Sequence, residues 1–345
     1  MAMGASMTDS SIIFNRKKVK YALLDTVLDM DLDNKTLNVV IDSRTLFDIF
    51  YIEFYHNLIP DLIKDSNNTV AELFNFIGHY NNYFRKKFRN LNIKFTIIYN
   101  SGPDNRETKD FTIWDKKNAK GCKLAYINFV LNKAQKITKY FKNISIIDGK
   151  GIDNHLIPLV LIENEDINYV HSALFITDDE FFFQYSKYFK NFALLKASNS
   201  IAKIYGKQDY WKFLYEKNSY KIKENQVLID SELTTASFLA YKGYEDITPI
   251  VDLKPKQLMA AFEKNYFANK DTFIMSLEAK LNNPEFNKRL HKLDLEFLND
   301  TILQEDRSCI YSQVNNSTKS CNNIMYSLNS KSFNEVINLQ FLLEV

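Results

Sequence analysis

Residues 171–188 constrain the fold more than any other stretch, because a buried strand there runs directly into a group of acids. Residues 173–177 (ALFIT) form a short apolar run that is typical of a buried strand. Asp178, Asp179 and Glu180 follow, and residues 181–188 predict a helix that either aspartate is placed to cap. In open α/β sheets, ligands bind beyond such strand ends, where acids can hold a divalent metal. An ordinary helix cap in a solvated acidic turn would leave the same pattern.

The same succession of strand, polar residue and helix recurs along the first two thirds of the chain. Strands are predicted at residues 37–41, 93–99, 144–147 and 192–196, and the first three are followed by Asp42, Asn100 and Asp148. Helical periodicity covers residues 44–59, 68–90, a run that ends near 141, and 155–164. The expected fold class is therefore α/β, with a mainly parallel central sheet and helices on both faces.

The alternation is expected to stop after about residue 200, where a mostly helical C-terminal region follows. A short strand is considered at residues 226–229, and helices are predicted at 233–242, 254–267, 271–282 and 284–303. Residues 304–331 are rich in serine and asparagine, which favours a loosely ordered tail.

Composition excludes several classes of function. The net charge is only +2, so any nucleic-acid binding must come from local basic clusters. The five histidines are scattered and form no HExxH motif, which makes a zinc site unexpected. The three cysteines form no CxxC pair, which indicates a reducing compartment, and no apolar run is long enough to predict a membrane span.

Four segments in order resemble the flap-endonuclease, PIN-like family of 5′-nucleases, and most of all its phage ribonuclease H members from T-even phages. The most specific piece is residues 109–118 (KDFTIWDKKN), which is similar to the basic helical arch of that family. Residues 176–188 are similar to its strand, acid and helix, 238–249 to the entry of its helix–three-turn–helix motif, and 285–300 to a stretch near its C-terminus. The resemblance spans roughly residues 37–303.

The chain is expected to divide into four parts. Residues 1–20 are expected to be an expression leader and flexible N-terminus, because MAMGAS precedes a further methionine at residue 7, and the resemblance implies a PIN-like nuclease-fold domain at residues 21–205. Residues 206–303 would form a helical region of the three-turn, DNA-binding type, and residues 304–345 a polar C-terminal tail.

In this family about seven carboxylates hold two Mg²⁺ ions, which activate water and offset charge on the cleaved phosphate. Carried over position by position, the set keeps only three acids here: Asp42, Asp179 and Asp246. Asp148, Asp153 and Asp178 are candidate replacements. The other family positions are occupied by Asn100, Gly151, Asn154 and Phe181.

Two basic segments that flank the expected cleft are candidates for phosphate contact, with aromatic side chains as stacking surfaces. The glycine-rich hairpin of the family is replaced by a glycine-free sequence with two lysines, and His155 is interpreted as a hydrogen-bonded structural histidine. The candidates are Arg85, Lys86, Lys87, Arg89, Arg106, Lys109, Phe111, Trp114, Lys116, Lys117, Lys120, Lys254 and Lys256.

Three functions remain open at this point. The favoured one is a pseudo-nuclease that binds branched or single-stranded DNA or RNA–DNA in viral replication or transcription, in the cytoplasm of an infected host cell. The second is an active, Mg²⁺-dependent 5′-nuclease or ribonuclease H that removes primers or flaps, with replaced ligands. The third is a non-enzymatic protein-interaction subunit whose acids only cap helices; possible partners are viral replication or transcription proteins, and no membrane is expected.

Overall fold

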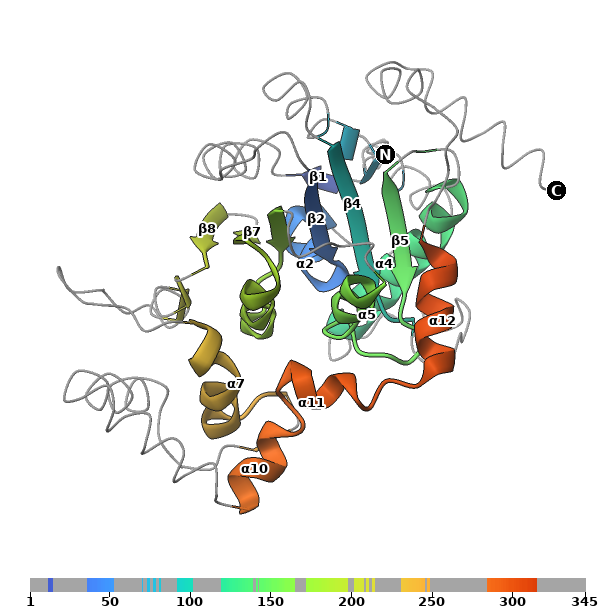
Figure 1. Ribbon diagram of the computed structural model, residues 1–345. Coiled ribbons are helices and arrows are strands. Elements are labelled where there is room, and N and C mark those ends of the chain that lie inside the picture. Colours follow the sequence, from blue (N-terminus) through green and yellow to red (C-terminus); the bar gives the residue numbers. More distant parts are fainter. Residues whose placement is uncertain are drawn as a thin grey trace, which may run out of the picture.

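The computed structural model of the chain (Figure 1) describes a sheet and the helices packed around it. It covers residues 12–14, 36–52, 70, 73–74, 77–78, 81, 92–101, 119–138, 141, 143–164, 172–197, 202–207, 209–210, 213–214, 231–245, 247–248 and 284–314.

The centre of the fold is a six-stranded sheet with the order β5-β4-β2-β6-β7-β8. Its first five members pair in parallel, and the sixth pairs antiparallel to its neighbour. A small antiparallel pair, β1 (Ile12–Phe14) with β3 (Phe50–Ile52), forms a second sheet. The six strands are β2 (Thr36–Asp42), β4 (Asn92–Tyr99), β5 (Ile144–Asp148), β6 (Ser172–Ile176), β7 (Asn191–Ala197) and β8 (Ala202–Gly206).

A parallel sheet that is covered on both faces buries the side chains of its strands on both sides. Near-continuous apolar runs in the sequence therefore form these strands. Every residue of β6 is buried, and so is every residue of β2 after Thr36. Val40 and Phe175 belong to a hydrophobic core that also contains buried residues of three helices. These are α5 (Ile157–Glu163), the 3₁₀ helix η4 (Glu180–Tyr188) and α7 (Ser231–Lys242).

Two further helices and the C-terminal helices complete the layers. The helices α2 (Ser43–Ile49) and α4 (Ala119–Thr138) pack against each other, and α4 also covers β5. The helices α10 (Pro284–Leu290), α11 (Leu295–Asn299) and α12 (Gln304–Gln313) return towards α7, α5 and the β5 edge (Figure 1). The expected α/β class, with a mainly parallel sheet followed by helices, is therefore confirmed.

Four details of the sequence analysis were wrong. The helix predicted over residues 44–59 ends at Ile49, because the chain then forms β3. The strand β8 was not predicted: it follows β7 directly, without an intervening helix, and extends the sheet by one antiparallel strand. The helix predicted over 284–303 is interrupted after Leu290, and Asp294 caps a new helix by accepting a hydrogen bond from the Glu296 N–H at 2.9 Å.

The fourth error concerns residues 304–313, which are not a loosely ordered tail. They form α12, whose polar composition follows from its position, because Ile310 is its one buried residue. The Gln313 amide pairs with the open edge of β5: Nε2 donates to Asp148 O at 2.9 Å and Oε1 accepts from Asp148 N at 2.8 Å. This side chain supplies the hydrogen bonds that a further strand would make.

Several predictions fall partly or wholly outside the described residues. Within the helix predicted at 68–90, the described positions Val70, Leu73, Phe74 and Ile77 are helical and buried. The predicted elements at 226–229, 254–267 and 271–282 lie outside the described residues, and the division into four parts stays a prediction. Within the part of the chain that the structure describes, no helix combines the length and apolarity needed to cross a membrane.

Candidate functional site

The strand order reverses between β2 and β6, and the chain leaves these neighbouring strands in opposite directions along the sheet. A crevice beyond the carboxyl ends of the strands at such a switch point is the usual ligand site of open α/β sheets. Ile41 pairs with Ile176, so Asp42 at the end of β2 lies near the loop 177–179 that follows β6. The two acids that the resemblance retains in this part of the chain, Asp42 and Asp179, therefore meet at this point.

Asp42 is buried, and donors surround both of its oxygen atoms. Oδ1 accepts from the backbone N–H of Arg44 at 3.1 Å and from Asn154 Nδ2 at 3.2 Å. Oδ2 accepts from Arg44 Nε at 3.1 Å and from the Thr177 hydroxyl at 3.3 Å. Burial raises the pKa of Asp42, and the positive charge of Arg44 opposes that rise. Four donors satisfy this carboxylate from within the chain.

Arg44, in the first turn of α2, spreads its guanidinium over three carboxylates. Nε binds Asp42, Nη2 lies 3.1 Å from Asp179 Oδ2, and Nη1 lies 3.2 Å from Glu245 Oε1. Burial works against the charged form, but the charges of Asp42 and Asp179 prevail and raise the pKa of Arg44. The planar fork of five N–H groups suits this bridging role, which an ammonium group would not reproduce.

His155 lies next to this bridge, with a carboxylate at each ring nitrogen. Nδ1 lies 2.6 Å from Asp153 Oδ1, and Nε2 lies 2.8 Å from Asp179 Oδ2. Burial lowers the pKa of His155, but the hydrogen bonds to Asp153 and Asp179 outweigh burial and the nearby Arg44 charge, raising it to about 9. The raised pKa favours the imidazolium at neutral pH, and the partners at both ring nitrogens confirm a hydrogen-bonded histidine.

Asp179 also caps the helix that follows it, as predicted. Its Oδ1 accepts from the Phe181 N–H at 3.0 Å, and its Oδ2 accepts from the Tyr244 hydroxyl at 2.6 Å. Burial would raise the pKa of Asp179, but the His155 hydrogen bond and the charges of His155 and Arg44 lower it well below the ordinary value. Burial, followed by the charge of Asp179, raises the pKa of Tyr244, so its hydroxyl remains a donor.

The four positions where the resemblance expects further acids have structural roles. Asn154 donates to Asp42, which a second carboxylate could not do. Phe181 is buried against the His155 ring, with the ring centroids 4.6 Å apart. Asn100 and Gly151 bind each other, because the Gly151 N–H donates to Asn100 Oδ1 at 3.1 Å.

The three candidate replacement acids differ in their surroundings. Asp153 joins the cluster through His155. Asp148 binds other partners than the residues around Arg44. Its Oδ2 accepts from the Ser101 hydroxyl at 2.6 Å, and its Oδ1 accepts from the backbone N–H groups of Ser101 and Lys150. Asp178 is exposed and takes no part in the hydrogen bonds and ion pairs around Arg44.

All but one of the remaining candidates lie outside the described residues. They are Asp246 and the proposed nucleic-acid contacts Arg85, Lys86, Lys87, Arg89, Arg106, Lys109, Phe111, Trp114, Lys116, Lys117, Lys254 and Lys256, whereas the backbone of Lys120 lies at the start of α4.

Sequence reasoning missed three members of the cluster: Arg44, Tyr244 and Glu245. Arg44 stands two residues after a strand-terminal acid, which was a usable signal, because a guanidinium at that spacing can fold back onto the acid. Tyr244 and Glu245 are about 200 residues from Arg44 in the chain, and only the packing of α7 against η4 brings them to the sheet. Glu245 has a left-handed backbone, with φ of 50°.

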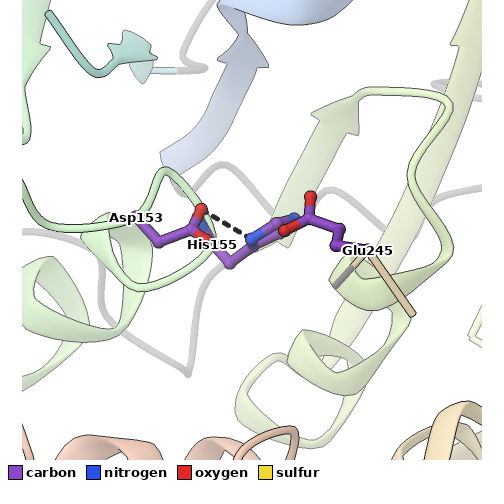
Figure 2. A group of neighbouring side chains, drawn as sticks. All are labelled: Asp153, His155 and Glu245. Carbon is purple, nitrogen blue, oxygen red and sulfur yellow. Dashed lines mark hydrogen bonds and ion pairs between the residues drawn. The ribbon is translucent and has the colours of Figure 1, made fainter. Parts of the chain in front are cut away.

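A metal ion would compete with Arg44 for the same oxygen atoms. Figure 2 shows the group that comes nearest to a ligand set, Asp153, His155 and Glu245, whose ligand atoms lie within 4.8 Å of one another. Arg44 Nη2 is 2.8 Å from His155 Nε2, and Nη1 already binds Glu245. Because the guanidinium fills this space and His155 offers a nitrogen where Mg²⁺ takes oxygen ligands, the described residues do not fit a two-magnesium centre.

Comparisons with known proteins gave only distant structural likenesses. No family model matches the chain, and no curated protein matches its sequence. The D15 protein of bacteriophage T5, crystallised with metal ions, is similar at 12% identity and a TM-score of 0.44, over 86% of this chain and 100% of its own. A substituted T5 D15 flap endonuclease in a pseudo-enzyme–product complex with DNA and metal ions gives 13% identity and a TM-score of 0.43, over 80% and 98%.

Human GEN1 in complex with Holliday junction DNA gives 9% identity and a TM-score of 0.35, over 84% of this chain and 60% of its own. All three TM-scores lie below 0.5. The architecture therefore rests on the strand order described above.

Proposed function

We propose that this chain is a nucleic-acid-binding protein with a 5′-nuclease-type architecture that does not cleave by a metal-dependent mechanism. One observation carries the proposal: the guanidinium of Arg44 lies between Asp42 and Asp179, 3.1 Å from an oxygen of each. Metal-assisted phosphoryl transfer needs those carboxylates as metal ligands, so that the metal can generate the attacking hydroxide. In this chain the Arg44 guanidinium already neutralises the carboxylates of Asp42 and Asp179.

The cluster itself is a poor phosphate site. Four carboxylates, those of Asp42, Asp153, Asp179 and Glu245, face the two cations Arg44 and His155. The local charge is therefore negative and repels a phosphodiester backbone. Nucleic acid would instead be held by the two basic segments at residues 85–89 and 106–117, with Trp114 as a stacking surface.

The proposed ligand is forked or single-stranded DNA, or an RNA–DNA hybrid. The role would be in viral replication or transcription inside an infected cell, together with viral proteins of those processes. This part of the proposal is supported by the order of the four sequence segments that resemble 5′-nucleases, of which residues 109–118 are the most specific.

A cleavage assay tests the catalytic half of the proposal. The purified chain is incubated in excess with 5′-flap DNA and with an RNA–DNA hybrid, in Mg²⁺ and separately in Mn²⁺. We expect no product that depends on the protein. Metal-dependent product that persists through repurification would establish the active nuclease instead.

Salt-dependent binding tests the other half. For a single-stranded arm, log K is expected to fall linearly with log[salt], by roughly 0.7 for each phosphate neutralised. The double substitution Lys116→Ala and Lys117→Ala should therefore reduce the slope by about 1.4. The matched control, Lys288→Ala with Lys292→Ala on and just after α10, removes the same charge elsewhere and should leave the slope unchanged. Binding that is absent or insensitive to salt would leave only a protein-interaction role.

A further inference from the structure

We propose that Arg44 is a positioning residue whose guanidinium takes the place of a divalent metal. Its ion pairs with Asp42, Asp179 and Glu245, here called the clamp, hold the turn after α7 against the carboxyl end of the sheet. The inference depends on the geometry of the ion pairs around Arg44. It would stand even if the chain bound no nucleic acid.

The clamp joins three segments that are far apart in the sequence. Each nitrogen of the fork has its own carboxylate: Nε binds the last residue of β2, Nη2 binds Asp179 after β6, and Nη1 binds Glu245 after α7. Among the described residues, Arg44 is the one side chain that forms ion pairs with all three segments. An ion that bridged the same carboxylates would impose the same connection.

The turn after α7, residues 243–245, has a backbone conformation that directs two side chains towards Asp179 and Arg44. Gly243 and Glu245 have positive φ angles of 82° and 50°, and Tyr244 and Ile247 form an isolated β-bridge. The tight turn points the Tyr244 hydroxyl at Asp179, 2.6 Å away, and Glu245 at Arg44. Lys242, at the end of α7, forms an ion pair with the buried Glu180. The side chains of Lys242, Tyr244 and Glu245 therefore bind η4, the loop after β6 and Arg44, respectively.

Removing Arg44 should leave carboxylates that no remaining cation can neutralise. His155 would still bind Asp153 and Asp179, but Asp42 and Glu245 would lose their charged partner. An uncompensated charge on the buried Asp42 is strongly destabilising, whereas Glu245 is 46% exposed and keeps contact with water. Oxygen ligands without a cation are also what a hard divalent ion binds. The Arg44→Met chain should therefore become less stable and should gain affinity for Mn²⁺.

The test measures both consequences on the full chain. Free Mn²⁺ is followed by electron paramagnetic resonance, and Tm by circular dichroism with Mn²⁺ or with EDTA. Arg44→Met is expected to lower Tm by about 10 °C in EDTA, to bind Mn²⁺ at this site, and to recover at least half of the lost Tm when it does. The unaltered chain should bind no Mn²⁺ there and show the same Tm in both conditions.

Three further variants keep the test decisive. Arg44→Lys keeps the charge but not the fork, so it should have an intermediate Tm without gaining Mn²⁺ affinity. Glu245→Gln releases the turn without exposing Asp42, and should speed proteolysis near residues 242–248 even if Arg44→Met fails to fold. Lys187→Met removes a cation from the exposed pair with Glu296 and serves as the matched control.

Two results would overturn the inference. The first is Mn²⁺ binding by the unaltered chain as tight as that of Arg44→Met, which would mean that Arg44 is not the resident cation. The second is the absence of any effect of Arg44→Met on Tm in EDTA, or of Glu245→Gln on proteolysis, which would mean that Arg44 clamps nothing.

Discussion

The buried imidazolium of His155 makes the stability of the fold depend on pH in a direction that can be worked out. In the folded chain the pKa of His155 is raised to about 9 from an ordinary value of 6.5, because hydrogen bonds to Asp153 and Asp179 outweigh burial. Between these two values the folded chain holds a proton that the unfolded chain has released. The stabilisation is therefore complete below pH 6.5 and is lost as the pH rises to about 9.

The size of the effect follows from the same pKa values. The difference between a pKa of 6.5 and one of about 9 corresponds to about 3 kcal/mol of folding free energy for an unscreened pair. The Asp153 side chain is 50% exposed, so solvent screens one of the two partners. We therefore expect the free energy of unfolding to fall by roughly 2 kcal/mol between pH 6 and pH 9.5 on account of this residue.

Urea denaturation at intervals across that range measures the fall, and His155→Gln isolates the contribution of the ring. The neighbouring Tyr244 has a raised pKa and Arg44 stays charged, so neither titrates in this window. The difference between the two chains should shrink as the pH rises. Curves that stay parallel within about 0.5 kcal/mol would refute the assignment of the charge to His155.

Three other substitutions have definite expected outcomes in urea denaturation. Gly149→Ala would place a Cβ 2.3 Å from the Ile152 carbonyl oxygen, so it should cost about 1–3 kcal/mol and distort the loop that carries the site; unchanged stability would contradict the close approach. Gln313→Leu leaves the N–H and C=O of Asp148 at the sheet edge without partners and should cost roughly 1–3 kcal/mol; a neutral effect would show that α12 does not secure this edge. Asp179 has a lowered pKa, so its contribution is present above about pH 4 and is lost as the pH falls further; Asp179→Asn should lack that acid-induced loss, and an unchanged acid profile would contradict the ion pairs.

The sequence predicted the sheet well because parallel strands are buried on both faces and therefore appear as continuous apolar runs. The runs that became β2, β4, β5, β6 and β7 all have this character. The short strand β8 (AKIYG) contains a lysine and ends in glycine, and its antiparallel pairing follows from tertiary context. The polar helix α12 was missed for a related reason, because a single buried residue leaves no periodic signal.

The site was predictable only where the signal was local. A strand that ends in Asp42 and a cap at Asp179 could be recognised from neighbouring residues, and their meeting follows from parallel pairing. Their shared partner had a weaker local signal. For Arg44 that signal was its spacing of two residues from Asp42, whereas Glu245 reaches Arg44 only because α7 packs on η4.

The central claim is that Arg44, and not a metal, neutralises the acids at the switch point of the sheet. The most direct measurement is an anomalous difference map from crystals of the unaltered chain soaked in Mn²⁺. We predict no peak between Asp42 and Asp179, and continuous density for the Arg44 guanidinium that bridges them. A manganese peak coordinated by both carboxylates, with the guanidinium displaced, would contradict it.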